Sequence, residues 1–425
     1  MEIHELLYRL YDEADTGTLG QYQDFVDLFP PVDSRVALEH WQEAGEALAR
    51  HKDEIRNSFP GGETLAEIAA RASREQAFTA LDLLAKYDRA VNVLVLDVDE
   101  TLRSAGSTDN EIPRETLHLL TELHEDGMPI VICTGQTLEN VKGFAIQGLG
   151  SELVHSGNVS IVYEGGTGVF TPGHGSATKQ LLYEDLDDEV RTVFETVRSR
   201  VLPDASEDVR RGCHLQGNEF NVTLKPNYDV GSSRAREIVD EALCYLLDLL
   251  GETAVEALGD HDPEEGAQWA RTFYADADPE IRAVLEARGE MPETITESES
   301  APATESIPED VEALLGRIDV GYYEADAAEI TSLELNKVVG VEAALDVLGV
   351  AEPFAIVMGD SKSDLRVMEW VDEEDAGIAA APDHASRDVL DHVIRTDELI
   401  FEEGSAAEML RTVYALDRLT RLNLD

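Results

Sequence analysis

Two aspartates, Asp97 and Asp99, end an apolar run that begins at Val91. A run of β-branched and leucine side chains with a polar stop is typical of a central strand of a parallel sheet, buried on both faces. In open α/β sheets the ligand site lies beyond the carboxyl ends of such strands. The position of these two carboxylates, rather than their spacing, therefore makes them candidates for chemistry.

The composition makes an Asp-x-Asp pair weak evidence when it is taken alone. The chain has 88 acidic and 33 basic residues, and its formal net charge is −55 over 425 residues. Similar pairs recur at Asp185/Asp187 and Asp276/Asp278. An EF-hand calcium loop is excluded for the first pair, because Leu102 stands where that loop needs glycine. The case for a site therefore depends on partners from other strand ends.

Polar side chains, and a glycine beside one of them, follow the ends of two further predicted strands, 129–133 and 354–358. In chain order these groups are Thr134, Gly135, Asp360 and Asp364. Lys337, one of only seven lysines, lies near the start of the helix predicted over 336–348, just before the second of these strands. Because the carboxyl ends of parallel strands meet at one edge of a sheet, we expect all these groups to converge on one crevice.

This set of groups suits phosphoryl transfer. Carboxylates at two strand ends can hold Mg²⁺, which prefers oxygen ligands and usually takes only a few of them from protein. A lysine and a hydroxyl can balance the charge on the phosphoryl oxygens. One carboxylate close to the metal can attack phosphorus, and another two residues further on can protonate the leaving oxygen and later activate water.

The four motifs, in this order, resemble those of the haloacid dehalogenase superfamily of aspartate-nucleophile phosphatases. The matching residues are Asp97-Val98-Asp99-Glu100-Thr101, Thr134, Lys337 and Gly359-Asp360-Ser361-Lys362-Ser363-Asp364. The similarity covers roughly residues 91–157 and 330–400. The large insert between the second and third motifs resembles the cap of the Cof-type, sugar-phosphatase-like branch of that superfamily.

The resemblance implies roles for the four aspartates. Asp97 would be the nucleophile and a Mg²⁺ ligand. Asp99 would be the general acid/base and would bind the metal through its backbone carbonyl. Asp360 would complete the metal site, and Asp364 would support it.

The resemblance also implies a phosphoryl-binding set. Its members would be Thr134, Gly135 and Lys337. The sequence departs from the family's pattern at three positions, which are Glu100, Gln136 and Ser363. Relatives more often have glycine, arginine and asparagine there. None of the three changes removes a catalytic group, but they leave the substrate undefined.

Strands and helices alternate from residue 91 onward, which predicts an α/β fold with a Rossmann-like parallel sheet and helices on both faces. We expect this catalytic core to span 89–157 and 330–425. Residues 158–329 are expected to form an inserted α+β cap, within which the acidic Ser/Thr/Pro-rich tract near 290–309 is a predicted disordered loop. Residues 1–88 carry helical periodicity and predict an accessory segment packed on the main body.

Individual elements are predicted from short apolar runs. The core is expected to contain strands near 152–155, 377–380 and 392–394. Short strands at 160–163 and 168–171 are placed in the insert, and the glycines between them predict a hairpin turn rather than a dinucleotide-binding loop. A helix over 233–250 is also expected in the insert.

Composition bounds the location and the partners. No apolar run approaches the roughly 20 residues of a membrane span, and the first residues lack the basic start of a signal peptide. Three cysteines without metal-ligand spacing indicate reduced thiols, so we expect a cytoplasmic protein. The distributed acidity argues against nucleic acid as a partner and is typical of a salt-rich cytosol. The oligomeric state is left open.

The residues leave three functions in consideration. The first is Mg²⁺-dependent hydrolysis of a small phosphorylated metabolite, a sugar phosphate or a similar phosphomonoester, through an aspartyl phosphate. The second is a phosphomutase or phosphotransferase built on the same core. The third is a regulatory protein without turnover that uses residues 1–88 for binding. The sequence does not define the substrate.

Overall fold

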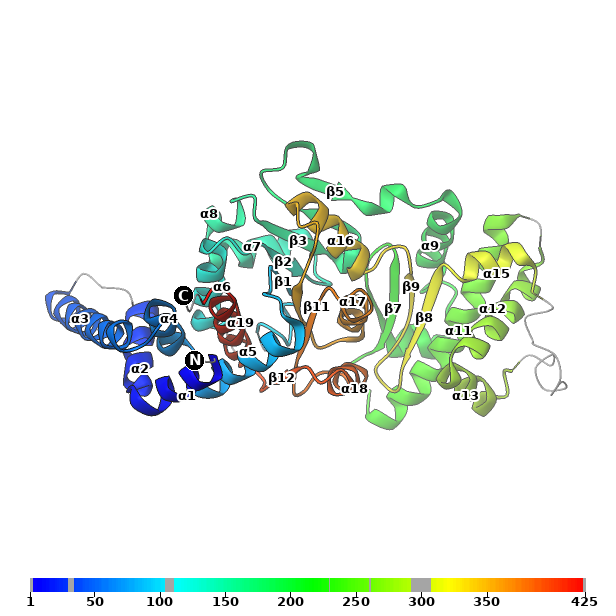
Figure 1. Ribbon diagram of the computed structural model, residues 1–425. Coiled ribbons are helices and arrows are strands. Elements are labelled where there is room, and N and C mark those ends of the chain that lie inside the picture. The colour runs from blue at the N-terminus through cyan, green and yellow to red at the C-terminus, as the bar shows by residue number, and fades with distance from the viewer. Residues whose placement is uncertain are drawn as a thin grey trace. The chain divides into compact units, whose positions relative to one another are not determined.

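A computed structural model describes residues 3–29, 34–103, 111–228, 230–259, 261–291 and 307–422. Contacts within the chain define two compact units (Figure 1). The first contains Met1–Gln180 and Gly340–Asp425, and the second contains Leu181–Val339. The tract predicted to be disordered near 290–309 lies, apart from its ends, outside the described residues.

The chain begins with five helices, as the apolar periodicity predicts. They are α1 (Ile3–Glu13), α2 (Thr16–Leu28), α3 (Arg35–Ser58), α4 (Gly62–Arg71) and α5 (Arg74–Tyr87). Ser73 begins α5 with a capping box, in which its hydroxyl accepts from the Gln76 N–H and its own N–H donates to the Gln76 side chain. Buried residues of these helices, such as Leu6 and Ile68, belong to the same hydrophobic cluster as Leu94 of the sheet. The helices therefore share one core with the sheet.

The first unit contains an eight-stranded sheet in the order β12-β11-β10-β1-β2-β3-β4-β5. Its strands are β1 (Val93–Leu96), β2 (Ile130–Cys133), β3 (Val159–Tyr163), β4 (Gly168–Phe170), β5 (Lys179–Leu181), β10 (Ala355–Met358), β11 (Gly377–Pro382) and β12 (Leu399–Phe401). Strands β12 to β3 run parallel to their neighbours, whereas β4 is antiparallel to β3. Every residue of β1, β2 and β10 is buried, as expected for central strands covered on both faces. The predicted α/β fold class is confirmed.

Helices connect and cover these strands. They are α6 (Arg114–Glu125), α7 (Leu138–Leu149), α8 (Ser151–Val154), α16 (Lys337–Leu348), α17 (Lys362–Glu373), α18 (Arg387–Arg395) and α19 (Ala406–Thr420). Helix α17 contacts β10 and β11, and α7 contacts β3. Helix α19 packs against α4, α5 and α6, so it joins the amino-terminal helices to the rest of the unit (Figure 1).

Two predicted strands are wrong. Residues 152–155 lie in and just after α8, since an apolar pair as short as Leu153-Val154 fits a helical turn as well as a strand. Residues 392–394 lie in α18, where Val389, His392 and Val393 are buried at helical spacing and Ile394 is 65% exposed. The strand predicted there is β12, seven residues further along the chain.

The structure places two strands of the expected insert in the core sheet. Strand β3 pairs in parallel with β2, and β4 returns antiparallel to β3. The glycines between them form the predicted hairpin connection, with positive φ at Gly165 and Gly166. A parallel partner far away in the sequence decides the sheet to which a strand belongs, and local pattern does not contain that information.

The second unit has a four-stranded antiparallel sheet in the order β6-β7-β9-β8. Its strands are β6 (Cys213–Gln216), β7 (Asn221–Pro226), β8 (Ile318–Tyr323) and β9 (Ala327–Ser332). Its helices are α9 (Asp188–Arg200), α10 (Glu207–Gly212), α11 (Ser232–Leu258), α12 (Pro263–Ala277), α13 (Pro279–Arg288) and α15 (Glu309–Leu315). A short 3-10 turn of this unit lies at Leu182–Asp185, and those at Glu164–Gly166 and Gly175–Ala177 belong to the first unit. A separate hydrophobic cluster forms the core of this unit.

The longest helix of the second unit continues beyond its predicted end. The apolar pattern predicts a helix over 233–250, but α11 runs through Gly251 to Leu258. A Cβ atom at Gly251 would lie 2.1 Å from the carbonyl oxygen of Gly266 in α12. Glycine at this position therefore allows α11 and α12 to pack closely and does not end the helix.

Candidate active site

Hydrogen bonding at the end of the central strand fixes the position of Asp97. Its backbone N–H donates to the Met358 carbonyl at 2.9 Å, which extends the parallel pairing of β1 and β10 by one residue. The side chain of Asp97 is buried. The predicted convergence of these two strand ends is therefore present.

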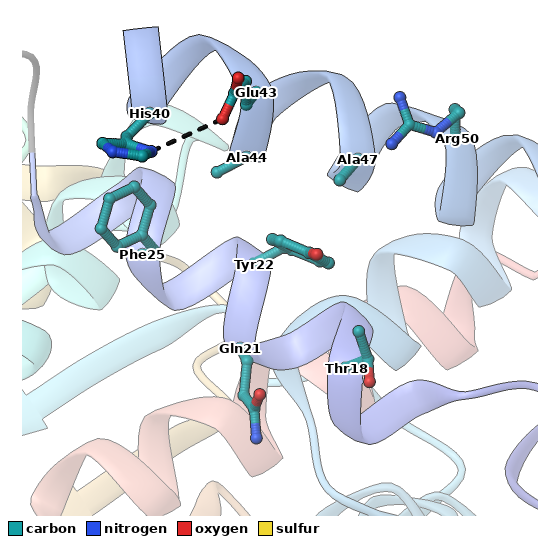
Figure 2. Close-up of a pocket in the computed structure, with 9 residues that line it drawn as sticks. All are labelled: Thr18, Gln21, Tyr22, Phe25, His40, Glu43, Ala44, Ala47 and Arg50. Atoms are coloured by element: carbon teal, nitrogen blue, oxygen red, sulfur yellow. Dashed lines mark ion pairs between the residues drawn. The ribbon is translucent and has the colours of Figure 1, made fainter. Parts of the chain in front are cut away.

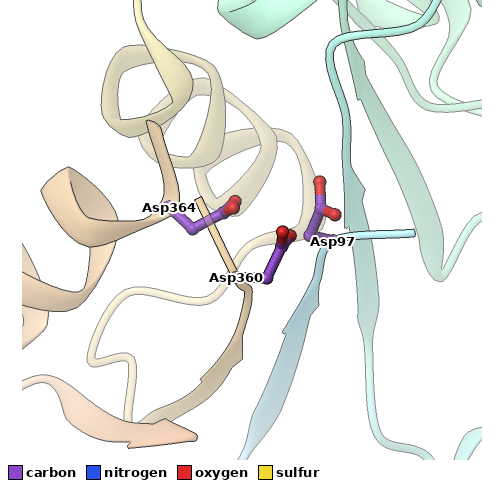
Figure 3. Close-up of side chains that lie close together, drawn as sticks. All are labelled: Asp97, Asp360 and Asp364. Atoms are coloured by element: carbon purple, nitrogen blue, oxygen red, sulfur yellow. The ribbon is translucent and has the colours of Figure 1, made fainter. Parts of the chain in front are cut away.

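Three carboxylates meet at this point (Figure 3). One carboxylate oxygen from each of Asp97, Asp360 and Asp364 lies within 4.8 Å of the other two. Asp97 and Asp364 are buried and Asp360 is partly buried. Negative charges this close in a buried setting repel one another strongly unless a cation compensates them. An all-oxygen donor set of this kind fits a hard divalent cation.

The fourth predicted motif forms a tight loop around Asp364. A Cβ atom at Gly359 would lie 2.3 Å from the Asp364 Cβ atom, so only glycine leaves room for that side chain. The Asp364 Oδ2 atom accepts hydrogen bonds from the Ser361 N–H at 3.1 Å and from the Ser361 hydroxyl at 2.6 Å. Asp364 therefore holds the first turn of α17 and also faces the other two carboxylates.

Asp360 is held from two sides. The hydroxyl of Thr101, which is buried, donates to the Asp360 Oδ1 atom at 3.4 Å. The Asp360 carbonyl accepts from the N–H of Ser386, the residue that directly precedes α18. The first motif therefore positions Asp360 through Thr101 as well as supplying Asp97.

A tight turn at Glu100 directly follows Asp99. Glu100 has a φ of 58°, a left-handed conformation that is unfavourable for a side chain other than glycine. The N–H groups of Leu102 and Arg103 both donate to the Val98 carbonyl at 3.1 Å. This geometry explains why glycine suits the position that Glu100 occupies.

The turn brings Asp99 against two polar side chains. The Asp99 Oδ1 atom accepts from the Arg103 guanidinium, at 3.0 Å from Nε and 2.7 Å from Nη2. The Asp99 Oδ2 atom accepts from the Gln136 side-chain amide at 2.5 Å. Asp99 therefore does not join the three clustered carboxylates through its side chain, which is 41% exposed.

The second strand end supplies Thr134. Its N–H donates to the Val162 carbonyl and its carbonyl accepts from the Gly165 N–H, both at 3.0 Å. The Thr134 hydroxyl oxygen accepts from the Gln136 N–H at 3.1 Å, which leaves the hydroxyl hydrogen able to donate elsewhere. A Cβ atom at Gly135 would meet no atom within 4 Å, so the backbone beside Thr134 is open.

Lys337 is the first residue of α16 and is buried. The Asn336 side chain accepts from the N–H groups of Val338 and Val339, at 2.8 and 3.2 Å, and so caps this helix. Lys337 belongs to the second compact unit, while the helix continues into the first unit from Gly340 onward.

Sequence reasoning missed two residues of this arrangement. Thr101 lies in the first motif, which assigns it no task, although it contacts Asp360. Arg103 lies outside all four motifs, and it binds Asp99 across a separation of four residues. The sequence contained one signal for this contact, because Arg103 follows the candidate acid Asp99 by four residues in a chain with far fewer basic than acidic residues.

The amino-terminal helices contain a separate hollow of about 650 Å³ (Figure 2). It lies between α2 and α3, with Tyr22 and Phe25 on one side and Ala44 and Ala47 on the other. The carboxylate of Glu43, the one acid in its lining, pairs with His40 at 3.5 Å. Its lining therefore offers no cluster of carboxylates like the one at the sheet edge.

A comparison with models of known families places the chain. The haloacid dehalogenase-like hydrolase model matches residues 94–195 and 221–393, more than half of the chain. The protein belongs to the haloacid dehalogenase-like hydrolases, and the recognition made from its four motifs is confirmed. A search of curated proteins gives no match. Among the described residues, no helix is long and apolar enough to cross a membrane.

Solved structures similar to this chain include members of the same family. A HAD/COF-like hydrolase from Plasmodium vivax is 13% identical, with a TM-score of 0.42, over 81% of this chain and 100% of that one. Trehalose-6-phosphate phosphatase from Aspergillus fumigatus is 14% identical, with a TM-score of 0.41, over 79% and 97%. A haloacid dehalogenase-like hydrolase from Bacteroides thetaiotaomicron is 14% identical, with a TM-score of 0.38, over 77% and 99%.

Proposed function

We propose that this protein is a Mg²⁺-dependent phosphatase that hydrolyses a small phosphorylated metabolite, such as a sugar phosphate, through an aspartyl phosphate on Asp97. The observation that carries the proposal is the cluster of Asp97, Asp360 and Asp364 at two adjacent strand ends. Membership of a hydrolase family agrees with this reaction class.

The metal site proposed here uses the residues of that cluster. Asp97, Asp360 and Asp364 would hold Mg²⁺, together with the backbone carbonyl of Asp99. When bound, the metal supplies positive charge that stabilises the phosphoryl group during its transfer. Thr101 and Ser361 hold Asp360 and Asp364 in place by hydrogen bonds, as partners of metal ligands commonly do.

The chemical work is divided between two aspartates. A carboxylate oxygen of Asp97 attacks phosphorus, and the bond from phosphorus to the leaving oxygen breaks. Asp99 gives a proton to that leaving oxygen and then takes a proton from the water that hydrolyses the aspartyl phosphate. The separate surroundings of the two side chains support this division, since Asp97 faces the carboxylate cluster and Asp99 faces Arg103 and Gln136.

The phosphoryl oxygens would be bound by Thr134, Gly135 and Lys337. The Thr134 hydroxyl has a hydrogen to donate, and the backbone at Gly135 is open to a ligand. Lys337 supplies the positive charge. We assign the second unit the part of a cap that contributes to substrate choice, as in the sugar-phosphatase-like branch of the family.

Two basic side chains of the proposed cap lie in ion pairs with neighbouring acids. Arg211 pairs with Glu207 at 2.9 Å, and Lys225 pairs with Asp326 at 3.4 Å. A cytoplasmic location is proposed from the three cysteines, all of which are buried thiols.

Phosphate release from a panel of phosphomonoesters tests this function. We expect the purified chain to release phosphate with Mg²⁺, to lose that activity with a chelator, and to regain it when Mg²⁺ is restored. Absence of release from every phosphomonoester would contradict the proposal. Product analysis with added sugar acceptors separates hydrolysis from phosphotransfer, because a phosphotransferase forms a new ester in place of inorganic phosphate.

A further inference from the structure

We infer that Arg103 and Gln136 are positioning residues that fix the Asp99 carboxylate, so that its Oδ2 atom exchanges the proton in both steps. This inference rests on the proposed function, and it assigns tasks to Arg103, which lies outside the four motifs, and to Gln136, which departs from the family's pattern. It starts from the three hydrogen bonds that converge on one partly exposed side chain.

Three hydrogen bonds restrict the orientation of the Asp99 carboxylate. A carboxylate that is 41% exposed would ordinarily sample several orientations, since nothing but its own rotamer restricts it. Two nitrogens of the Arg103 guanidinium donate to Oδ1 and fix that oxygen, and the Gln136 amide donates to Oδ2 and so restricts rotation of the carboxylate. The Arg103 side chain is itself only 9% exposed, so its position is fixed by the surrounding protein.

These hydrogen bonds differ between the two oxygens of Asp99. An ionised carboxylate has about four lone-pair positions, two on each oxygen. The two nitrogens of Arg103 occupy the positions on Oδ1, and the Gln136 amide occupies one on Oδ2. Among the described residues, the Gln136 amide makes the one hydrogen bond to Oδ2, so this oxygen keeps a second lone-pair position with which to exchange a proton.

Gln136 orients Asp99 without adding a charge beside it. The family's usual arginine at this position would place a second positive charge next to Asp99, whereas a glutamine donates one hydrogen bond without charge. Gln136 is anchored by its own backbone, because its N–H donates to the Thr134 hydroxyl and its carbonyl accepts from the Glu164 N–H at 2.8 Å. The second strand end therefore orients Asp99 as well as offering the Thr134 hydroxyl.

The second half-reaction balances in bonds, protons and electron pairs. In the second half-reaction, a water oxygen forms a bond to phosphorus, and the bond between phosphorus and the Asp97 oxygen breaks. The water proton passes to Oδ2 of Asp99, and the electron pair of the broken bond returns to Asp97 as a carboxylate. No further co-reactant is needed.

Steady-state kinetics of Arg103→Ala, Arg103→Lys and Gln136→Ala provide the first test. We expect Arg103→Ala to lower kcat about 100-fold with little change in KM, because misplacing a catalytic group by about 1 Å has an effect of that size. Arg103→Lys should recover part of the loss, and Gln136→Ala should show a smaller loss than Arg103→Ala. In an Asp99→Ala background, Arg103→Ala should lower kcat by no more than about twofold, since its effect acts through Asp99. Full additivity of the two changes overturns the inference.

A choice of substrate makes the test specific. The leaving group of p-nitrophenyl phosphate needs no proton. With this substrate, Arg103→Ala should therefore slow hydrolysis of the aspartyl phosphate and not its formation. Acid quenching should then trap more phosphorylated enzyme in Arg103→Ala than in the wild type. A wild-type kcat with a wild-type level of phosphorylated enzyme overturns the inference.

A crystal structure of Arg103→Ala tests the inference independently of turnover. We expect the Asp99 carboxylate to leave its position or to lose order, while Asp97, Asp360 and Asp364 stay in place. An unmoved Asp99 overturns the positioning role even if the enzyme is an active phosphatase. A displaced Asp99 in a protein that hydrolyses no phosphomonoester would support the positioning role and contradict the proposed function, so the two failures can be told apart. Gln136→Ala gives the same readout if Arg103→Ala does not fold.

Discussion

At the scale of single residues, the site depends on how closely Asp364 approaches the backbone of Gly359. The two motif residues are five positions apart, and a Cβ atom at Gly359 would occupy the space of the Asp364 side chain. The carboxylate cluster therefore depends on the absence of one methyl group as much as on its three acids.

Gly359→Ala should weaken metal binding. The new methyl group would displace Asp364, and loss of a supporting group near a metal commonly lowers affinity about 10- to 100-fold. Isothermal titration of the full chain with Mg²⁺ measures this change. Gly143→Ala is the matched control, because a Cβ atom at Gly143 would meet nothing within 4 Å. Equal Mg²⁺ affinity in Gly359→Ala and the wild type would contradict this account of the loop.

At the scale of elements, charged groups join the amino-terminal helices to the core. The Arg411 guanidinium of α19 reaches Asp24 of α2 at 2.7 Å and Glu115 of α6 at 2.6 Å, and it also bonds to the Arg71 carbonyl of α4. Its side chain is 14% exposed. One arginine therefore holds elements that are nearly 390 residues apart in the sequence.

Replacing Arg411 should destabilise the first unit. Removing Arg411 should cost about 1–3 kcal/mol, because a mostly buried guanidinium and its hydrogen bonds are lost, while Asp24 and Glu115 are 45% and 41% exposed and stay partly solvated. We expect Arg411→Ala to lower the free energy of unfolding by that order in chemical denaturation. Arg387→Ala is the control, since Arg387 is 91% exposed and its contact with Asp391 is 3.7 Å long. Equal losses in the two variants would show that the network does not join these helices.

A direct contact between α2 and α6, from Asp27 to His118, should respond to pH. His118 lies 3.2 Å from Asp27, and its interaction with that carboxylate raises the pKa of His118 although burial opposes the shift. Burial alone would raise the pKa of Asp27, but bonding to His118 and Gln23 outweighs it and leaves the pKa lowered.

The sign of the pH effect follows from these two directions. The raised pKa of His118 stabilises the fold below about pH 6.5, and that contribution is lost as the pH rises through the folded-state value. The lowered pKa of Asp27 stabilises the fold above about pH 4, and that contribution is lost as the pH falls through the folded-state value. The wild type should therefore exceed His118→Gln in unfolding free energy by up to about 1 kcal/mol between these values. A difference that grows from pH 7 to pH 9 would be inconsistent with this pair.

At the scale of the whole molecule, the net charge of −55 governs stability in salt. Self-repulsion of surface carboxylates disfavours the compact state, and salt shortens its range from about 10 Å at 0.1 M to about 3 Å at 1 M. We expect the melting temperature to rise when KCl is increased over this range. A melting temperature that falls with added KCl would show that salt mainly weakens the ion pairs and does not relieve repulsion.

How much of the molecule the sequence predicts depends on scale. The buried strands β1, β2 and β10 and the residues at their ends were predictable, because a continuous apolar run that stops at polar residues is typical of a central strand in an α/β fold. The strand expected at 392–394 was wrong, since three residues are too few to separate a period of 2 from a period of 3.6.

Contacts between side chains were harder to predict from the sequence than the strands. The hydrogen bond from Arg103 to Asp99 lies across the left-handed turn at Glu100, and a glutamate at that position does not predict such a turn. The pairing of β3 with β2 likewise depends on tertiary structure. Motifs therefore identified the acids, and the structure was needed to show what holds each of them.

The most direct test of the central claim is the site of phosphorylation. The purified chain is mixed with Mg²⁺ and a phosphomonoester that it hydrolyses, quenched in acid, reduced with borohydride and mapped by mass spectrometry. The account predicts a reduced acyl phosphate at Asp97, and it predicts that Asp97→Asn retains its fold but loses at least about 1,000-fold in phosphate release. Modification at another residue, or undiminished phosphate release by Asp97→Asn, would contradict it.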